Sequence, residues 1–432
     1  MERRDFLAGG GALVTAGSLA SVVASIAEAS AQIRGRSDED VARDEDYWLA
    51  VRQAYNVDAR YILLNAGGSN PCPRTVHETR QRLTDFVNAS PNINTNRSDI
   101  YPTIRTVKRR LAQHLGCDVA EVALTRNTTE GLSIFIASLE LQPGDEILCS
   151  NEEYHVTEAA MRLRERRDGA RIVRVGWSTP ARSKQEIVEA FRADFTDRTK
   201  AVIMCQVHHV GGQIMPVAEI CAEARRRGVV SCVDGALGFG HILTNVREMG
   251  CDYYASSLHK YLSAPLGTGV FYVRQPLIAS TWPLYGIDDP ENEDKIWKFE
   301  AVGTRPMADF AAVASAIDFY EAVGPSRKQA RLHYLKRYWM DRLRGEPKVR
   351  FSVSPEPEHS CATVIVAVDG VGGRELNQHL AEAHRVWCYG PVKAGPYEGV
   401  YVAPNLFTRP ADLDVFVAAI RQTAREGVAR PA

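Results

Sequence analysis

The chain has 432 residues, of which 45% are hydrophobic and 24% charged, with 52 Lys and Arg against 53 Asp and Glu. This length allows one large or two medium domains with a substantial core. The balanced charge, without an acidic or basic tail, gives no reason to expect nucleic acid or a charged membrane surface as a partner.

Residues 1–31 have the composition of an export signal. Arg3 and Arg4 precede an apolar run from Ala8 to Ala27, and the residues 29–31 (Ala-Ser-Ala) offer a cleavage site before Gln32. A charged start, an apolar run and small residues at the cut predict a signal peptide. The paired arginines resemble a twin-arginine signal, which predicts a periplasmic protein and the twin-arginine translocase as a transient partner. The Gly, Ser and Thr content of the run disfavours the alternative of a stable membrane anchor.

The cysteines number nine, an odd count, and none are spaced Cys-x-x-Cys. Exported proteins often contain disulfides, but a twin-arginine substrate folds in the reducing cytoplasm before export. Since several cysteines lie in apolar runs, we expect most of them to be reduced core residues.

From about residue 121 to 275, short apolar runs alternate with amphipathic stretches. The predicted strands cover 121–125, 146–149, 171–175, 201–206, 229–233, 253–256 and 269–273. The helices predicted between them cover 130–139, 158–166, 184–193 and 217–227. This alternation predicts an α/β fold with a mostly parallel seven-stranded sheet between helices, and sites in such sheets lie at the carboxyl ends of the strands.

The segment from residue 308 onward changes character. Helices are predicted over 309–322, 326–342, 374–384 and 410–422, and strands over 362–368, 385–389 and 400–402. This pattern predicts a smaller α+β domain at residues 308–432, after a large domain at 91–307. Residues 32–90 are expected to join the small domain or to form an arm across a partner subunit.

The strongest local signal is the run Ser256-Ser257-Leu258-His259-Lys260, which directly follows an apolar strand. Lysine is seldom buried unless it has a partner or a task. In a partly desolvated pocket its pKa falls and its amine becomes nucleophilic, as Schiff-base chemistry requires. The alternative is a surface lysine whose stem packs on apolar side chains.

A carboxylate ends a neighbouring strand, because Asp234 follows the apolar run 229–233 and precedes Gly235. A carboxylate in this position could keep the pyridine nitrogen of pyridoxal phosphate (PLP) protonated, so that the ring accepts electrons from a substrate carbanion. The alternative is an aspartate that only caps the turn through Gly235.

Two threonines, Thr128 and Thr129, lie where the strand at 121–125 gives way to a helix. The backbone amides at that helix N-terminus, together with both hydroxyls, would bind a phosphate. A plain capping box is the alternative, and it is compatible with a phosphate site.

Further polar side chains follow two more strands. Tyr154 or His155 could stack on a pyridine ring, and His208 or His209 could reach the phenolate oxygen of the cofactor. A structural role for each histidine is the alternative. Adjacent histidines on a regular element do not face one centre, and no third ligand has suitable spacing, so no metal site is predicted.

The order of these motifs resembles that of the PLP-dependent aminotransferase class V family. The motifs are the Thr-rich turn, Glu153-Tyr154, Asp234-Gly235-Ala236, the run ending in His259-Lys260, and Gly303-Thr304. The resemblance covers about residues 60–425, and the stretch 299–306 is most similar to the isopenicillin-N-epimerase-like branch. It implies fold type I, PLP as the cofactor and Lys260 as the Schiff-base lysine.

The resemblance also implies roles for other residues. The implied phosphate ligands are Thr128, Thr129, Ser257 and His259. The other implied contacts are Asp234 at the pyridine nitrogen, Tyr154 stacked on the ring, His209 near the phenolate oxygen and Asn65 in a loop near the substrate. Thr304 would reach the phosphate of the neighbouring subunit's cofactor, which implies a homodimer.

Two positions depart from the family pattern. Leu237 stands where the family commonly has a Gln or His that contacts the phenolate oxygen, so His209 is expected to take that role. Tyr401 stands where the family has the arginine that binds the substrate carboxylate, and a phenol does not replace a bidentate guanidinium. Either the substrate presents no free α-carboxylate there, or another arginine takes over, the candidates being Arg97, Arg105, Arg305 and Arg409.

The sequence therefore predicts an exported PLP enzyme that forms an external aldimine with an amine or an amino-acid-derived small molecule. Transamination, epimerisation and decarboxylation share that beginning, and tailoring of a siderophore or another natural product fits the export signal. One alternative is a cysteine desulfurase or lyase, which needs a loop thiolate, although Cys361 and Cys388 lie in apolar runs. The other alternative is a degenerate protein that binds PLP or another ligand without turnover.

Overall fold

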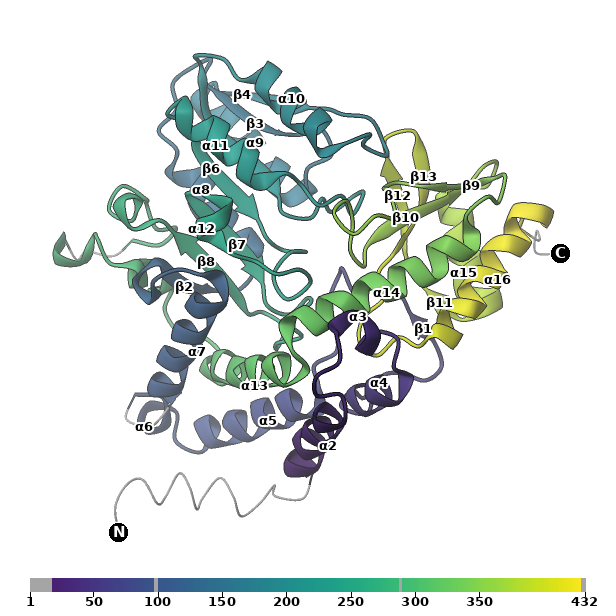
Figure 1. Ribbon diagram of the computed structural model, residues 1–432. Helices are drawn as coiled ribbons and strands as arrows, with labels where there is room; N and C mark the ends of the chain where they lie inside the picture. Colours follow the sequence, from purple (N-terminus) through teal and green to yellow (C-terminus); the bar gives the residue numbers. More distant parts are fainter. Residues whose placement is uncertain (1–17, 97–99, 287–289, 429–432) are drawn as a thin grey trace, which may run out of the picture.

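The computed structural model describes residues 18–96, 100–286 and 290–428, so Arg3, Arg4 and Arg97 lie outside the described residues (Figure 1). The first described helix, α2 (Ser18–Gln32), contains the predicted cleavage site at residues 29–31. Ile26 of this helix is buried against a cluster that includes Trp48. Within the described ranges, no helix combines the length and apolar character needed to cross a membrane.

The larger sheet has seven strands in the order β2-β8-β7-β6-β5-β3-β4. Only β8 runs antiparallel to its neighbours β2 and β7, and the other pairs are parallel. The short connection 258–268 explains the reversal, because parallel neighbours need a longer crossover. The predicted fold class is confirmed, and the strands are β2 (Val122–Thr125), β3 (Glu146–Ser150), β4 (Arg171–Val175), β5 (Thr199–Cys205), β6 (Val230–Asp234), β7 (Tyr253–Ser257) and β8 (Gly269–Val273).

Helices cover both faces of this sheet, since alternate strand residues enter two different cores. Ala201 and Ile203 of β5 pack in one core with α8 (Thr128–Ser138) and α9 (His155–Asp168). Val202 and Met204 pack on the opposite face. That second face is covered by α7 (Ile100–Leu115), α10 (Lys184–Asp194) and α11 (Val217–Arg226). The short α12 (Val246–Met249) precedes β7, and 3-10 turns lie at Val119–Glu121, Gln275–Leu277, Pro290–Asn292 and Ile296–Glu300.

The smaller sheet is antiparallel, with the order β12-β13-β10-β9. Its strands are β9 (Val349–Phe351), β10 (Val364–Val368), β12 (Tyr389–Ala394) and β13 (Tyr397–Val402), and α14 (Pro325–Leu343), α15 (Gly373–His384) and α16 (Pro410–Glu426) accompany it. The strand predicted over 385–389 is divided at Cys388. Its first part, β11 (Val386–Trp387), pairs in parallel with β1 (Ile62–Leu63), and the next strand turns into the four-stranded sheet.

The N-terminal segment contacts both domains. The strand β1 and the helices α3 (Asp38–Val41) and α4 (Glu45–Arg52) lie on the small-domain side, and α3 packs beside α14 (Figure 1). The helices α5 (Arg74–Ala89) and α6 (Pro91–Asn96) continue toward the large domain. The helix α13 (Met307–Val323) packs on α5 and α7, and Phe310 and Ile317 join the large-domain core.

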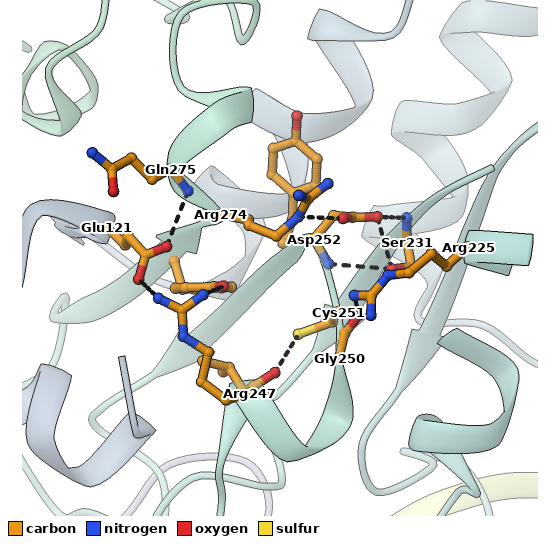
Figure 2. A network of polar contacts seen from close by, with 12 residues as sticks. Glu121, Arg225, Ser231, Arg247, Gly250, Cys251, Asp252, Arg274 and Gln275 are labelled. Carbon is orange, nitrogen blue, oxygen red and sulfur yellow. Dashed lines mark hydrogen bonds and ion pairs between the residues drawn. The ribbon is translucent and has the colours of Figure 1, made fainter. Parts of the chain in front are cut away.

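A buried polar network ties the strands together at the edge opposite their carboxyl ends (Figure 2). Asp252, just before β7, accepts hydrogen bonds from the Ser231 backbone N–H (2.9 Å) and from Arg274 Nε (2.8 Å). Beside it, Glu121 accepts from the Gln275 backbone N–H (3.0 Å) and pairs with Arg247. Because these contacts join the ends of β2, β6, β7 and β8, they fix the register of the strands whose other ends carry the site.

We expect Asp252→Asn to lower the free energy of unfolding by roughly 2–4 kcal/mol. The variant removes a buried charge, and the NH₂ group of its amide would face the N–H donors that now bond to the carboxylate. Urea unfolding followed by circular dichroism measures the change. Asp197→Asn is the matched control, since Asp197 is exposed and makes no ion pair within the described part of the chain. An unchanged midpoint for the Asp252 variant would show that the network does not stabilise the sheet.

Candidate active site

A cavity of about 600 Å³ lies at the carboxyl ends of β5, β6 and β7, between the two domains. Its large-domain wall includes Asn127, Thr128, Thr129, Tyr154, His155, Cys205, His209, Asp234, Ser257, His259 and Lys260. The loop at 65–68 and the strands β12 and β13 form the facing wall. The cavity therefore lies where the doubly covered sheet predicts a site, and most of the predicted site residues meet in it.

Lys260 lies in the turn that follows β7, and several contacts hold the backbone of this turn. Asn70 donates from Nδ2 to the Lys260 carbonyl (2.8 Å) and from its backbone N–H to the His259 carbonyl (3.2 Å). Lys328 of α14 donates to the carbonyl of Tyr261, the next residue. Burial lowers the pKa of Lys260, and the nearby Asp234 opposes that effect. The result is an amine on a fixed backbone, with an increased neutral fraction, as a nucleophile requires.

Asp234 ends β6 and is 4% exposed. Its Oδ1 accepts a hydrogen bond from the Ala236 backbone N–H (2.8 Å), and no cation lies within 4.0 Å of its carboxylate in the part of the chain that the structure covers. Burial raises the pKa of Asp234, while the Ala236 N–H and Lys260 lower it. A buried carboxylate without a cationic partner is costly, so a protonated ring nitrogen would supply what this side chain lacks.

The first turn of α8 and the end of β7 form a cup of donors. Ser257 Oγ accepts from the Thr128 backbone N–H (3.0 Å) and shares a hydrogen bond with Thr128 Oγ1 (2.8 Å). Asn127 caps the helix by accepting from the Glu130 backbone N–H (3.0 Å). The backbones approach so closely that a Cβ at Gly269 would lie 2.7 Å from Asn127 Cα. Hydroxyls at a helix N-terminus favour an anion, and a phosphate fits this cup.

The aromatic wall consists of Tyr154, His155 and His209, all of which line the cavity. The rings of Tyr154 and His209 lie 5.4 Å apart at 82°. Burial lowers the pKa of His209 well below its usual value, and its buried Nδ1 has no hydrogen-bond partner among the described residues. A neutral imidazole that lines the cavity can bond to a cofactor oxygen through a ring nitrogen that faces it. His208 instead lies behind the wall, where it contacts Ser150 Oγ (3.2 Å).

Glu153, Cys205 and His209 each place one potential metal ligand atom within 4.8 Å of the others. Cys205 Sγ donates to Glu153 Oε1 (3.2 Å), and Ser150 Oγ donates to Oε2 (3.2 Å). Burial and the charge of Asp234 raise the pKa of Glu153 to about 7, and burial raises that of Cys205 well above its usual value. A protonated thiol that donates to a carboxyl group fits a hydrogen-bonded wall better than a metal site.

Two predicted site residues lie outside the cavity. Thr304 is exposed, in the turn after Gly303. Arg305 donates from Nη1 to the Leu124 carbonyl (3.2 Å), and its guanidinium lies over the ring of Phe310. Among the other candidate arginines, Arg409 pairs with Asp412, and no arginine lines the cavity within the described ranges.

Asn65 and Tyr401 do line the cavity, where Tyr401 packs over the glycine loop. A Cβ at Gly67 would lie 2.0 Å from the Tyr401 hydroxyl, so only glycine leaves room for this ring. Sequence reasoning missed Lys393 and Tyr389, which also line the cavity from β12. The sequence of this segment gives no clear strand signal, because it contains Pro391 and proline is uncommon inside a strand.

Together, the fold and this site define a PLP-dependent enzyme of fold type I. The cup fits the cofactor's phosphate and Asp234 fits its ring nitrogen, and His209 lines the same cavity as a neutral imidazole. Residues 61–390 match the family model described as aminotransferase class-V. The chain belongs to this family, and pyridoxal phosphate is its cofactor.

The curated relatives include enzymes of two activities. The chain is 32% identical to an isopenicillin N epimerase from Amycolatopsis lactamdurans, over 69% of this chain and 79% of the relative. It is 26% identical to the isopenicillin N epimerase of Streptomyces clavuligerus, over 85% of this chain and 96% of the relative. A probable cysteine desulfurase from Halalkalibacterium halodurans is 30% identical, over 70% of this chain and 77% of the relative.

Solved structures share the fold at lower identity. The apo structure of a cysteine desulfurase from Thermococcus onnurineus NA1 has a TM-score of 0.77 and 19% identity, covering 87% of this chain and 97% of the other. A C-DES variant with glycine covalently linked to its PLP cofactor has a TM-score of 0.76 and 22% identity, covering 86% and 98%. These similarities support the architecture.

Proposed function

We propose that the protein catalyses proton transfer at the carbon that bears the amine of an amino-acid-derived substrate, with Lys260 as the covalent anchor of PLP and as the acid–base group. The observation that carries the proposal is the position of Lys260, in a cavity where burial lowers the pKa of its amine. When bound, PLP withdraws electrons from that carbon and weakens its C–H bond. As a neutral amine, Lys260 Nζ would accept the proton from that carbon and return it.

The other residues bind and orient. Thr128, Thr129, Ser257 and His259 would hold the phosphate, and Asp234 would keep the ring nitrogen protonated. Tyr154 would stack on the ring. His209 would bond to the phenolate oxygen, because Leu237 stands where the family commonly has a Gln or His for that contact. These residues would hold the cofactor in one orientation, and the orientation of the substrate relative to Lys260 would select the bond that breaks.

We favour epimerase-type chemistry over desulfuration because of the cysteines. A desulfurase needs an accessible thiolate near the substrate, and Cys205 is the cysteine that lines the cavity. Cys205, Cys361 and Cys388 are 1%, 0% and 3% exposed. Burial raises the pKa of each thiol, to about 12 for Cys361. These thiols are therefore protonated and enclosed at neutral pH.

Solvent exchange tests the proposal. The holoprotein is incubated in D₂O with L- and D-amino acids and with small peptides that carry a free amino terminus, and NMR then measures deuterium and configuration at the amine-bearing carbon. We expect deuterium incorporation with loss of configuration. Keto-acid formation would indicate transamination, and release of CO₂ would indicate decarboxylation. Either product would contradict the proposal of epimerase-type chemistry.

A Cys388→Ser variant serves as the control for the desulfurase alternative. We expect it to keep the exchange activity, because the thiol is buried and protonated. Sulfide release from L-cysteine by the wild-type protein, abolished in this variant, would contradict the proposal and support a desulfurase. Binding of amines without exchange or any product would support a degenerate ligand-binding protein instead.

We further propose that the enzyme works as a homodimer. Thr304 is exposed and lies outside its own cavity, so it is free to meet the phosphate of a second subunit's cofactor. Trp282 is 69% exposed and Tyr285 45%, and such exposed apolar side chains of the large domain are suited to a partner copy. Light scattering of the holoprotein measures its oligomeric state, and a monomer with full cofactor content would contradict the proposed homodimer.

Export by the twin-arginine route remains a proposal that rests on Arg3, Arg4 and the apolar run after them. This route would carry a protein that has already folded around its cofactor. N-terminal sequencing of the protein recovered from the periplasmic fraction tests it, with a start near Gln32 expected. Retention in the cytoplasm with an intact N-terminus would contradict the proposal.

A further inference from the structure

The helix α14 reaches from the core of the small domain to the turn that carries Lys260 (Figure 1). Near the end of this helix, Trp339 and Met340 are buried in the small-domain core. Near its start, Lys328 donates from Nζ to the carbonyl of Tyr261, the residue after Lys260. A single helix therefore connects the small domain to the backbone beside the cofactor lysine.

Lys328 is buried without a counter-ion. It is 3% exposed, and no carboxylate lies within 4.0 Å of its Nζ among the residues that the structure describes. The ring of Tyr320 lies 5.6 Å from Nζ. Burial lowers the pKa of Lys328 to about 7, and both the amine and the ammonium can donate to a carbonyl. Because a buried amine costs free energy, its place here is best explained by the carbonyl that it binds.

The turn that receives this hydrogen bond is held from outside at three successive carbonyls, those of residues 259–261. Asn70 donates to the first two, and Lys328 is the only donor to the third within the described ranges. Two residues further on, Ser263 has a φ of 58°, a left-handed conformation that is unfavourable for a residue with a side chain. Since such a conformation persists only where surrounding contacts fix it, the turn should relax when one of these contacts is lost.

From these contacts we propose that Lys328 is a positioning residue for Lys260, which it ties to the small domain through the Tyr261 carbonyl. The inference deepens the proposed function and rests on it, because it concerns the amine that anchors PLP and moves the proton. A lysine held in one position reacts with the cofactor as an intramolecular group, and its effective concentration falls when its backbone can move. The hydrogen bond from Lys328 therefore sets how readily a free amine displaces Lys260 from PLP.

The same helix contains a matched control for this role. Lys336, about two helical turns further along, is 0% exposed, and its Nζ donates to the carbonyls of Pro355 (2.6 Å) and Ser360 (2.9 Å). Burial lowers the pKa of Lys336 to about 8. Its acceptors belong to the small domain and do not line the cavity. Replacing Lys336 therefore removes a buried amine of the same kind without a direct contact to the Lys260 turn.

Competition with methylamine measures the positioning. The holoprotein is incubated with increasing methylamine at one pH and is then reduced with borohydride. Mass spectrometry gives the share of PLP fixed on the peptide that contains Lys260 and the share released as the methylamine adduct. We expect Lys328→Met to lower the methylamine concentration at half displacement about 5–10-fold. Lys336→Met should stay within about twofold of the wild type, as should Lys348→Met at an exposed lysine outside the cavity.

Urea unfolding separates positioning from stability, because Lys328→Met and Lys336→Met should both lower the midpoint while only the first changes the displacement. Lys328→Gln, whose side chain is one atom shorter, keeps the test possible if the methionine variant does not fold, and it should shift the displacement in the same direction. Equal displacement in the wild type and the Lys328 variants, or an equal shift in Lys336→Met, would overturn the positioning role. Absence of PLP trapped on Lys260 in the wild type would overturn the proposed function as well, which distinguishes the two failures.

Discussion

Replacing Lys260 with alanine is expected to abolish covalent attachment of the cofactor and to lower kcat/KM roughly a thousandfold or more. The side chain supplies both the amine that bonds to PLP and the group that moves the proton, so the variant loses both contributions. The phosphate cup and Asp234 remain, and PLP should still bind without a covalent link.

The visible absorption spectrum with and without borohydride measures this change. In the wild type we expect borohydride to fix PLP on the peptide that contains Lys260, as detected by mass spectrometry. The alanine variant should release PLP on denaturation after the same treatment, and Lys348→Ala should behave as the wild type. Trapping on another lysine would contradict the assignment. No band after addition of PLP would indicate a fold-type I scaffold put to another use.

Replacing Asp234 with asparagine is expected to lower kcat roughly a hundredfold, while the cofactor content changes little. The amide oxygen can still accept the Ala236 N–H, but its lack of charge no longer favours a protonated ring nitrogen. The loss of charge should also lower the pKa of Lys260 further, because Asp234 now opposes the effect of burial.

A fall in kcat without a loss of bound cofactor would identify a role of Asp234 in catalysis. The kcat of the exchange reaction should fall while PLP content, measured after alkaline release, stays near that of the wild type. Asp197→Asn, at an exposed site, should leave both quantities unchanged. Loss of PLP binding with an unfolded circular dichroism spectrum would instead show that Asp234 acts mainly on stability.

Much of the large domain could be predicted because strand and cofactor signals are local. The predicted strands over 171–175 and 269–273 coincide with β4 and β8, since apolar runs bounded by polar turns can be recognised without tertiary contacts. The helix predicted from residue 130 begins two residues earlier, at Thr128. This shift places Thr128 and Thr129 in the first turn, where backbone N–H groups have no partner within the helix.

The small domain was harder to predict because its strands are short and their partners are distant in sequence. The run 385–389 has a single apolar pattern, yet the structure divides it between a parallel pair with β1 and the antiparallel pair with β13. Nothing local to Cys388 marks that division. Lys393 was missed for the same reason, since only the pairing with β13 turns this strand toward the cavity.

The sequence by itself determined the strand-end residues Asp234, Ser257 and Lys260, because adjacent strands of a parallel sheet bring their carboxyl ends to one edge. It also determined the family and its cofactor, through polar motifs that are short and local. Only the tertiary structure decided that Arg305 turns away to the Leu124 carbonyl while Lys393 faces the cavity. The physical reason is that the direction of a long charged side chain depends on partners from other elements, which a linear pattern does not specify.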